Sequence, residues 1–223
     1  YGIIIPVAGS LVPEVRVWYN PEMKTRNYMV PGIMGLILMI TTLSLMSMAI
    51  VREREIGTLE QLIVTPIKKY QLLIGKLIPF TLIGFVVLVI VMIIMTQWFG
   101  IEVKGNKFYL LFTALLFVLS NLGLGLFVST VSKTQQQAMM ASVFALMMPM
   151  IYLSGFAFPI ENMPQVVQYI TYLIPLRYFI TILRGIVLKG IGFSSLWVET
   201  LILFGMGAAL LIMSSLRFSK KIE

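Results

Sequence analysis

The chain has 223 residues, of which 59% are hydrophobic and only 12% are charged, and its formal net charge is +8. A soluble domain carries about 25% charged residues, so this composition indicates that lipid is the main solvent. The absence of cysteine and histidine excludes disulfides, thiolate or imidazole metal sites, and catalysis by either side chain.

Residues 1–27 have the pattern expected at the end of an extracytoplasmic domain. Val15, Val17 and Tyr19 occupy alternate positions between Pro13 and Pro21, which predicts a strand. Because the sequence starts at Tyr1, with neither an initiator methionine nor a signal peptide, we expect a fragment whose N-terminal part is missing. Residues 28–223 are then predicted to form a membrane domain.

Five uncharged runs are long enough to cross a bilayer as helices, which takes about 20 residues each. Backbone groups in lipid must bond within their own segment, whereas a barrel would alternate with a period of two. The sequence therefore predicts an all-α integral membrane protein. In chain order the runs are Tyr28–Val51, Leu77–Ile101, Phe108–Ser132, Thr134 to about Ile160, and Thr200–Leu216, which can borrow from "GFSSLWV" before it.

The loop after the first run, "VREREIGTLEQLIVTPIKKY" (residues 51–70), gathers charge between two apolar runs. Thr58 followed three residues later by Gln61 is a capping-box pattern that starts a helix. Pro66 interrupts the hydrogen-bond ladder and ends that helix. The loop is therefore predicted to hold an amphipathic helix of about two turns, which is marginal alone and needs a surface to lie on.

This short helix can lie either on lipid headgroups or in a groove of a protein partner. Lipid headgroups would suit its apolar face and its cations. Glu53, Glu55 and Glu60 are unfavourable on an anionic leaflet, however, whereas a ridge of mixed charge with one apolar face suits a groove in a protein partner.

Residues 158–189 are apolar but interrupted by Pro159, Pro164 and Pro175, so their pieces are too short to cross a bilayer. Short re-entrant helices that dip into the outer leaflet fit this pattern better. Aromatic side chains are then expected at headgroup depth, namely Tyr169, Tyr172, Tyr178 and Phe179.

Lysine and arginine predict the orientation, because they are enriched in cytoplasmic loops. The densest clusters lie in residues 51–70 and in the tail after the last run, and five spans place both on one side. Residues 51–70 and the C-terminus are therefore predicted to be cytoplasmic, and residues 1–27 outside. Since apolar runs separate the cations, membrane lipid is the expected partner of this charge, and nucleic acid is not.

The segment "REREIGTLEQLIVTPI" closely resembles the cytoplasmic coupling helix of type-2 permeases of ATP-binding-cassette (ABC) exporters, in particular bacterial multidrug-type exporters. "NPEMKTRNYMVPGIMG", "LSGFAFPIENMPQVVQYITYLIPLRYF" and "SLRFSKK" agree in the same order, so the resemblance covers nearly the whole chain. It implies that residues 28–223 are a permease domain in the inner (plasma) membrane, with five of six membrane helices present. It also implies ATPase subunits and a second permease chain, identical or related, as partners.

The resemblance further implies that the residues around the short cytoplasmic helix couple the permease to its ATPase. These residues are Arg52, Glu53, Arg54, Glu55, Gly57, Thr58, Glu60, Gln61 and Pro66. It likewise implies that the proline-bounded outer helices, with Pro159, Pro164 and Pro175, form an outer gate.

No ATPase motif is expected on this chain, so it is not predicted to be an enzyme. Gly75-Lys76 lacks the upstream glycine of a phosphate-binding loop, and Leu77 stands where a serine or threonine should bind magnesium. ATP and magnesium are therefore expected on the partner, and no cofactor on this chain. The alternative is an ion-coupled secondary transporter, but such proteins keep an ionisable residue inside the membrane and the five runs offer none.

Polar residues inside the runs are the candidates for a substrate pathway: Thr42, Ser47 and Asn121. The buried amide of Asn121 needs partners, which are either a neighbouring helix or a hydrated cavity. Glycines in the third and fifth runs, namely Gly123, Gly125, Gly205 and Gly207, instead predict close packing between helices.

Overall fold

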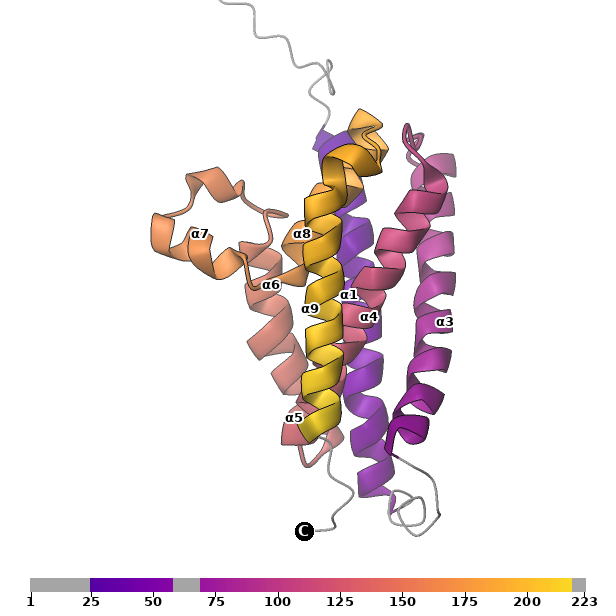
Figure 1. Cartoon of the computed structure of the whole chain (residues 1–223), viewed down its shortest axis with the longest axis vertical. Coiled ribbons are helices and arrows are strands. Elements are labelled where there is room, and N and C mark those ends of the chain that lie inside the picture. The colour runs from indigo at the N-terminus through magenta and orange to yellow at the C-terminus, as the bar shows by residue number, and fades with distance from the viewer. Residues whose placement is uncertain (1–24, 58–68, 218–223) are drawn as a thin grey trace, which may run out of the picture.

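Long apolar helices dominate the computed structural model, which describes residues 25–57 and 69–217 (Figure 1). Five helices of these residues are long and apolar enough to cross a membrane, which confirms the predicted fold class and number of spans. They are α1 (Thr25–Glu55), α3 (Lys69–Gln97), α4 (Lys107–Val131), α5 (Gln135–Met140) continued through η1 (Ala141–Met147) and α6 (Met148–Leu153), and α9 (Phe193–Arg217). The predicted strand, the short cytoplasmic helix and the C-terminal tail lie outside the described residues.

Successive spans run in opposite directions, so their ends gather at two ends of the bundle (Figure 1). We name these the Glu55 end, where α1 finishes, and the Thr25 end, where α1 begins. The start of α3, the finish of α4, the start of α5 and the finish of α9 all lie at the Glu55 end. This shared end is where the sequence analysis places the cytoplasm.

Helix α4 is the centre of the bundle. Within its most apolar window 72% of the residues are buried, against 11% in α3 and 22% in α9, so the outer helices present most of their surface to the surroundings. Phe117 of α4 stacks on Phe179 with ring centroids 4.3 Å apart. Gly125 lies against the backbone of α1, and Gly123 and Gly207 lie between α4 and α9, which confirms close packing at these three glycines. The prediction is wrong for Gly205, where an added Cβ would meet nothing within 4 Å.

The helix boundaries differ from the sequence prediction where polar residues are good helix formers. Helix α1 continues beyond Val51 to Glu55, since arginine and glutamate favour helices. The fourth span stops at Leu153 instead of near Ile160, because Gly155 has a φ of 80°, which ends the helix. Helix α4 begins as predicted, with the Asn106 side chain accepting hydrogen bonds from the amides of Phe108 and Tyr109.

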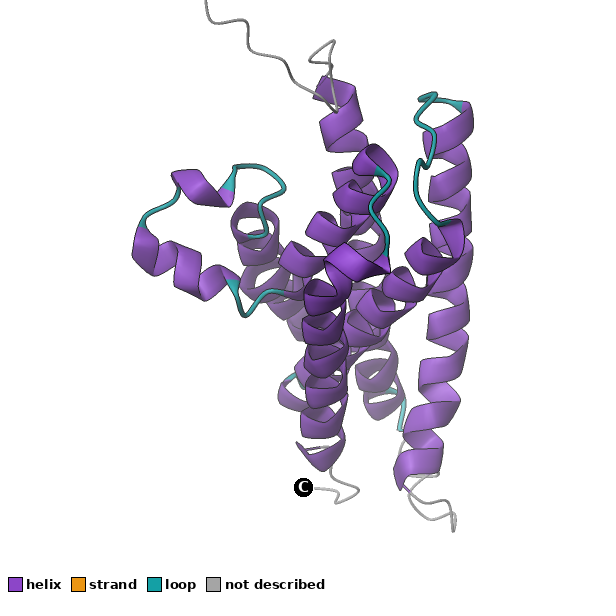
Figure 2. Cartoon of the chain, turned by 45° about the horizontal axis from the view of Figure 1, so that its top comes forward, coloured by secondary structure: helices purple, strands orange, loops and turns teal. Residues whose placement is uncertain are grey.

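The proline-rich segment forms two helices that meet at an angle of 85°. These are α7 (Gln165–Thr171), preceded by η2 (Ile160–Asn162), and α8 (Pro175–Arg184), continued by η3 (Gly185–Lys189). Helix α8 packs inside the bundle, whereas the segment from η2 through α7 projects from its side in both views (Figures 1 and 2). Tyr169 and Tyr172 are exposed as expected for headgroup depth, but Tyr178 and Phe179 turn into the bundle.

Candidate functional site

The last turn of α1 carries four of the predicted coupling residues, Arg52 to Glu55, at the Glu55 end of the bundle. Gly57 follows with a φ of 79°, a left-handed conformation that suits glycine and ends the helix. The remaining predicted coupling residues, Thr58, Glu60, Gln61 and Pro66, lie outside the described residues. Helix α1 therefore leads directly into the predicted coupling segment.

Glu53 forms an ion pair with Lys76 of α3. The side chain of Lys76 is 12% exposed and that of Glu53 is 34% exposed, so the pair is partly shielded from water. Lys76 lies seven residues after the start of α3, near the Glu55 end, where the opposite charge of Glu53 stabilises it.

Arg54 and Glu55 bind the turn between α4 and α5. The Arg54 guanidinium donates a hydrogen bond of 3.0 Å to the carbonyl of Ser132, the residue that caps α4. The Glu55 carboxylate accepts one of 2.9 Å from the backbone amide of Gln135 and another from the Gln135 side chain. Gln135 is the first residue of α5, so Glu55 satisfies an amide that has no partner within the helix.

The starts and ends of the spans agree with the prediction that the loop after the first span and the end of the last span lie on one side. The described cations do not distinguish the two ends of the bundle. Those of the Glu55 end are Arg52, Arg54, Lys76, Lys133 and Arg217, and those toward the Thr25 end are Arg26, Lys104, Lys107, Arg177, Arg184 and Lys189. The cytoplasmic placement of the Glu55 end therefore stays a prediction.

The predicted pathway residues are all buried. Thr42 donates to the carbonyl of Leu38 in its own helix, at 2.6 Å. Ser47 accepts a hydrogen bond of 2.9 Å from Ser142 of η1, which links α1 to the fourth span. The structure does not join these residues to Asn121 through any described hydrogen bond, and their role in a pathway stays a prediction.

Asn121 lies in α4 with no exposed surface. Its amide nitrogen donates to the carbonyl of Phe117 in its own helix at 3.0 Å, while its Oδ1 has no hydrogen-bond partner among the described residues. A buried acceptor without a partner is costly in an apolar interior. Whether Asn121 faces a neighbouring helix or a hydrated cavity therefore stays a prediction.

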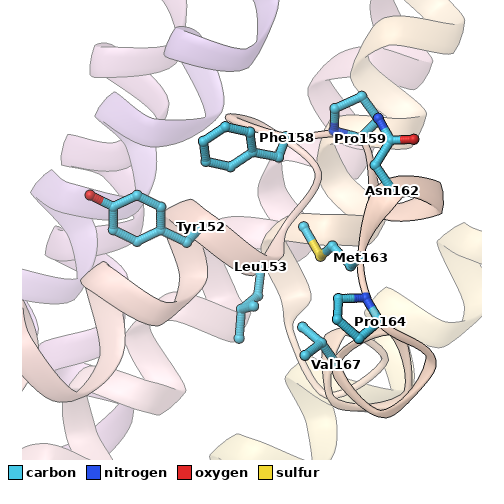
Figure 3. A pocket seen from close by; sticks show the side chains of 8 residues that line it. All are labelled: Tyr152, Leu153, Phe158, Pro159, Asn162, Met163, Pro164 and Val167. Atoms are coloured by element: carbon cyan, nitrogen blue, oxygen red, sulfur yellow. The ribbon is translucent and has the colours of Figure 1, made fainter.

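An apolar cavity of about 390 Å³ lies between the end of α6 and the projecting segment (Figure 3). Two of the three predicted gate prolines, Pro159 and Pro164, line it, whereas Pro175 is buried at the start of α8. The other side chains that line the cavity are Tyr152, Leu153, Phe158, Asn162, Met163 and Val167.

Two arginines that the sequence analysis did not select fix the segment around this cavity. Arg177 bonds the Thr171 hydroxyl and lies over the ring of Tyr172 at 3.9 Å, so it spans the bend between α7 and α8. Arg184 donates to the Tyr28 hydroxyl at 2.7 Å and to the carbonyl of Gly155 at 3.0 Å, which joins α8 to α1 and to the end of the fourth span. The signal in the sequence was an arginine among aromatic residues in an apolar segment.

Glu199, which directly precedes the last predicted run, lies within helix α9. The last span begins at Phe193, seven residues before the predicted Thr200, and so includes Glu199. Its Oε2 atom is buried and has no hydrogen-bond partner among the described residues. A count of uncharged residues stops at an acid, but helix formation does not.

Comparison with known proteins agrees with this architecture. Residues 5–216 match the family model described as ABC-2 family transporter protein. The chain is 36% identical over 177 residues to the probable multidrug ABC transporter permease YbhS of Escherichia coli K12, covering 79% of this chain and 47% of that relative. It is 38% identical over 183 residues to the probable multidrug ABC transporter permease YbhR of the same organism, covering 82% and 50%.

A third relative is the inner membrane transport permease YhhJ of Escherichia coli K12. It is 30% identical over 212 residues, which cover 94% of this chain and 56% of the relative. The chain thus spans about half the length of the curated relatives it matches.

Proposed function

Since this chain belongs to the ABC-2 family of transporter proteins, we propose that it is part of the membrane permease of an exporter driven by a separate ATPase subunit. The observation that carries the proposal is the course of α1. This helix crosses the bundle and leads, at the Glu55 end, into the segment whose sequence is typical of an ATPase-coupling helix.

In this proposal residues 57–66 dock into a groove of the ATPase on the cytoplasmic face of the inner membrane. Residues 1–27 then lie outside, and the C-terminus lies in the cytoplasm. Two ATPase subunits hold ATP and magnesium, and a second permease chain, identical or related, completes the transporter. The mostly exposed surfaces of α3, α5–α6 and α9 are compatible with contacts to lipid and to that second chain.

Binding of ATP to the ATPase pair would displace residues 57–66 and so bias the membrane helices between inward-facing and outward-facing states. A ligand shifts such an equilibrium only through contacts that differ between the two states. We assign that differential contact to the docking segment. At the Thr25 end, the segment bounded by Pro159 and Pro175 would act as the outer gate, since it projects from the bundle around an apolar cavity.

The test is charge reversal in the docking segment of the full-length permease, expressed with its ATPase. Glu60→Lys should lower the amount of ATPase that co-purifies and should uncouple ATP hydrolysis from transport. Glu102→Lys, an exposed acid in the loop between α3 and α4 at the Thr25 end, is the matched control and should leave the complex intact. A complex unchanged by Glu60→Lys would count against docking through this segment.

Glu199 favours a second candidate function, an ion-coupled secondary transporter. A carboxylate inside a membrane span with a buried, unpartnered oxygen is the kind of group that binds a proton or a cation during coupling. Transport in proteoliposomes separates the two functions. The ATP-driven permease requires ATP and the ATPase and is insensitive to protonophores, whereas an ion-coupled carrier works without either and stops when the ion gradient is dissipated.

A further inference from the structure

Three consecutive residues in the last turn of α1 each bind a different part of the bundle. Glu53 pairs with Lys76 of α3, Arg54 binds the carbonyl of Ser132 at the end of α4, and Glu55 binds Gln135 at the start of α5. Successive residues of an α-helix are about 100° apart around its axis. Three consecutive side chains therefore spread over about 200°, and Glu53 reaches α3 while Arg54 and Glu55 reach the two sides of the turn that joins α4 to α5.

Each of these contacts uses a group that needs a partner. The carbonyl of Ser132 lies where a helix leaves its last carbonyls unpaired, and the amide of Gln135 lies where a helix leaves its first amides unpaired. A cation suits the first position and a carboxylate the second, because both oppose the partial charge of the helix end. Lys76, only 12% exposed, is stabilised by the opposite charge of Glu53.

We propose that Glu53, Arg54 and Glu55 are positioning residues that fasten α3, α4 and α5 to the end of α1, so that a displacement of residues 57–66 reaches all four helices together. This inference rests on the proposed function and assigns these residues a different role from Glu60. They act on other parts of the same chain, whereas the docking segment touches the ATPase.

Exchanging the charges of Glu53 and Lys76 tests whether Glu53 acts through Lys76. If Glu53 acts through Lys76, the damage from Glu53→Lys should be repaired by Lys76→Glu, since the swap restores an opposite pair. If Glu53 instead contacts the ATPase, the change at Lys76 cannot repair it. The readout is the ATP-induced fluorescence change of a bimane label on α7. The label is attached through Val166→Cys, because Val166 is 73% exposed. The sample is the full-length permease with its ATPase in nanodiscs.

Glu53→Lys should reduce the ATP-induced change by about two- to five-fold, the factor expected for a partly exposed ion pair of about 0.5–1 kcal/mol. ATPase co-purification should stay at the wild-type level, and the double variant Glu53→Lys/Lys76→Glu should regain the wild-type fluorescence change. The control is Glu102→Lys, which should have no effect. If Glu53→Lys fails to assemble, a cycle of Glu53→Gln, Lys76→Met and the double variant tests the same pair, and strictly additive effects would overturn the inference.

The outcomes separate this inference from the proposed function. A Glu53→Lys variant that loses the ATPase and is not repaired by Lys76→Glu would overturn the positioning role and leave docking intact. A variant that behaves like the wild type would also overturn it. A wild-type permease that binds no ATPase, or that shows no response to ATP, would instead contradict the proposed function.

Discussion

Gly125 offers the sharpest test of the packing around α1. A Cβ added at this position would lie 2.8 Å from the Cβ of Met46, 2.9 Å from the carbonyl oxygen of Leu43 and 3.1 Å from the amide nitrogen of Ser47. Ordinary van der Waals contacts begin at 3.4 Å, so α1 and α4 would have to separate by about 0.6 Å to relieve the shortest contact of 2.8 Å. None of the three opposing atoms can rotate away, because two belong to the backbone of α1 and the third is a Cβ, whose position the backbone fixes.

Overpacking of this kind costs about 1–3 kcal/mol of stability. For a chain of this size each kcal/mol lowers Tm by about 2–4 °C, so Gly125→Ala should lower Tm by roughly 2–12 °C. The assay is thermal unfolding of the purified permease in detergent, followed by tryptophan fluorescence.

The matched control is Gly205→Ala in α9, where an added Cβ meets nothing within 4 Å. That variant should unfold at the wild-type temperature or above it, because alanine favours helices over glycine. The reasoning is refuted if Gly125→Ala is as stable as the wild type, or if both variants lose stability equally.

Three further substitutions test polar side chains and their partners. Asn121→Leu removes an unpartnered buried acceptor, so Tm should be unchanged or higher while the ATPase complex still assembles; a clear fall in Tm would contradict this. Tyr28→Phe removes a hydrogen-bond acceptor of Arg184 and should lower the free energy of unfolding by about 1 kcal/mol. Tyr169→Phe, at an exposed position of α7, is the control and should leave that free energy unchanged. Equal losses in the two variants would contradict a role for the Arg184–Tyr28 bond. Arg177→Ala should speed chymotrypsin cleavage within residues 165–173 by about tenfold, the factor that corresponds to ~1.4 kcal/mol for the lost contacts of Arg177 with Thr171 and Tyr172. Unchanged cleavage would show that the bend between α7 and α8 does not depend on Arg177.

The helical spans could be predicted from sequence because the bilayer imposes their length and satisfies no backbone group. The ends of these helices were predicted less accurately, because a charged residue ends an uncharged run and yet favours the helix. Glu55 and Glu199 are both helical, and a count of uncharged residues excludes each of them. Gly155 shows the converse case, where a left-handed glycine ends a helix inside an apolar run.

The partners of the charged residues were beyond the reach of the sequence. Glu53 and Lys76 are 23 positions apart, while Arg54 and Ser132 are 78 apart and Glu55 and Gln135 are 80 apart. No local pattern links residues at such separations, because the links depend on which helices pack together. The sequence shows that these charges are unusual for so apolar a chain, but only the structure shows what they bind within it.

Photo-crosslinking from position 60 tests most directly whether this chain takes its energy from a separate ATPase. A photoreactive amino acid in place of Glu60, in inside-out membrane vesicles that hold the full-length permease and its ATPase, should give one dominant crosslinked product. That product should contain the ATPase, and its yield should change when ATP is added. Crosslinks to lipid alone, or a position 60 that reacts only with reagents added to right-side-out vesicles, would contradict the account.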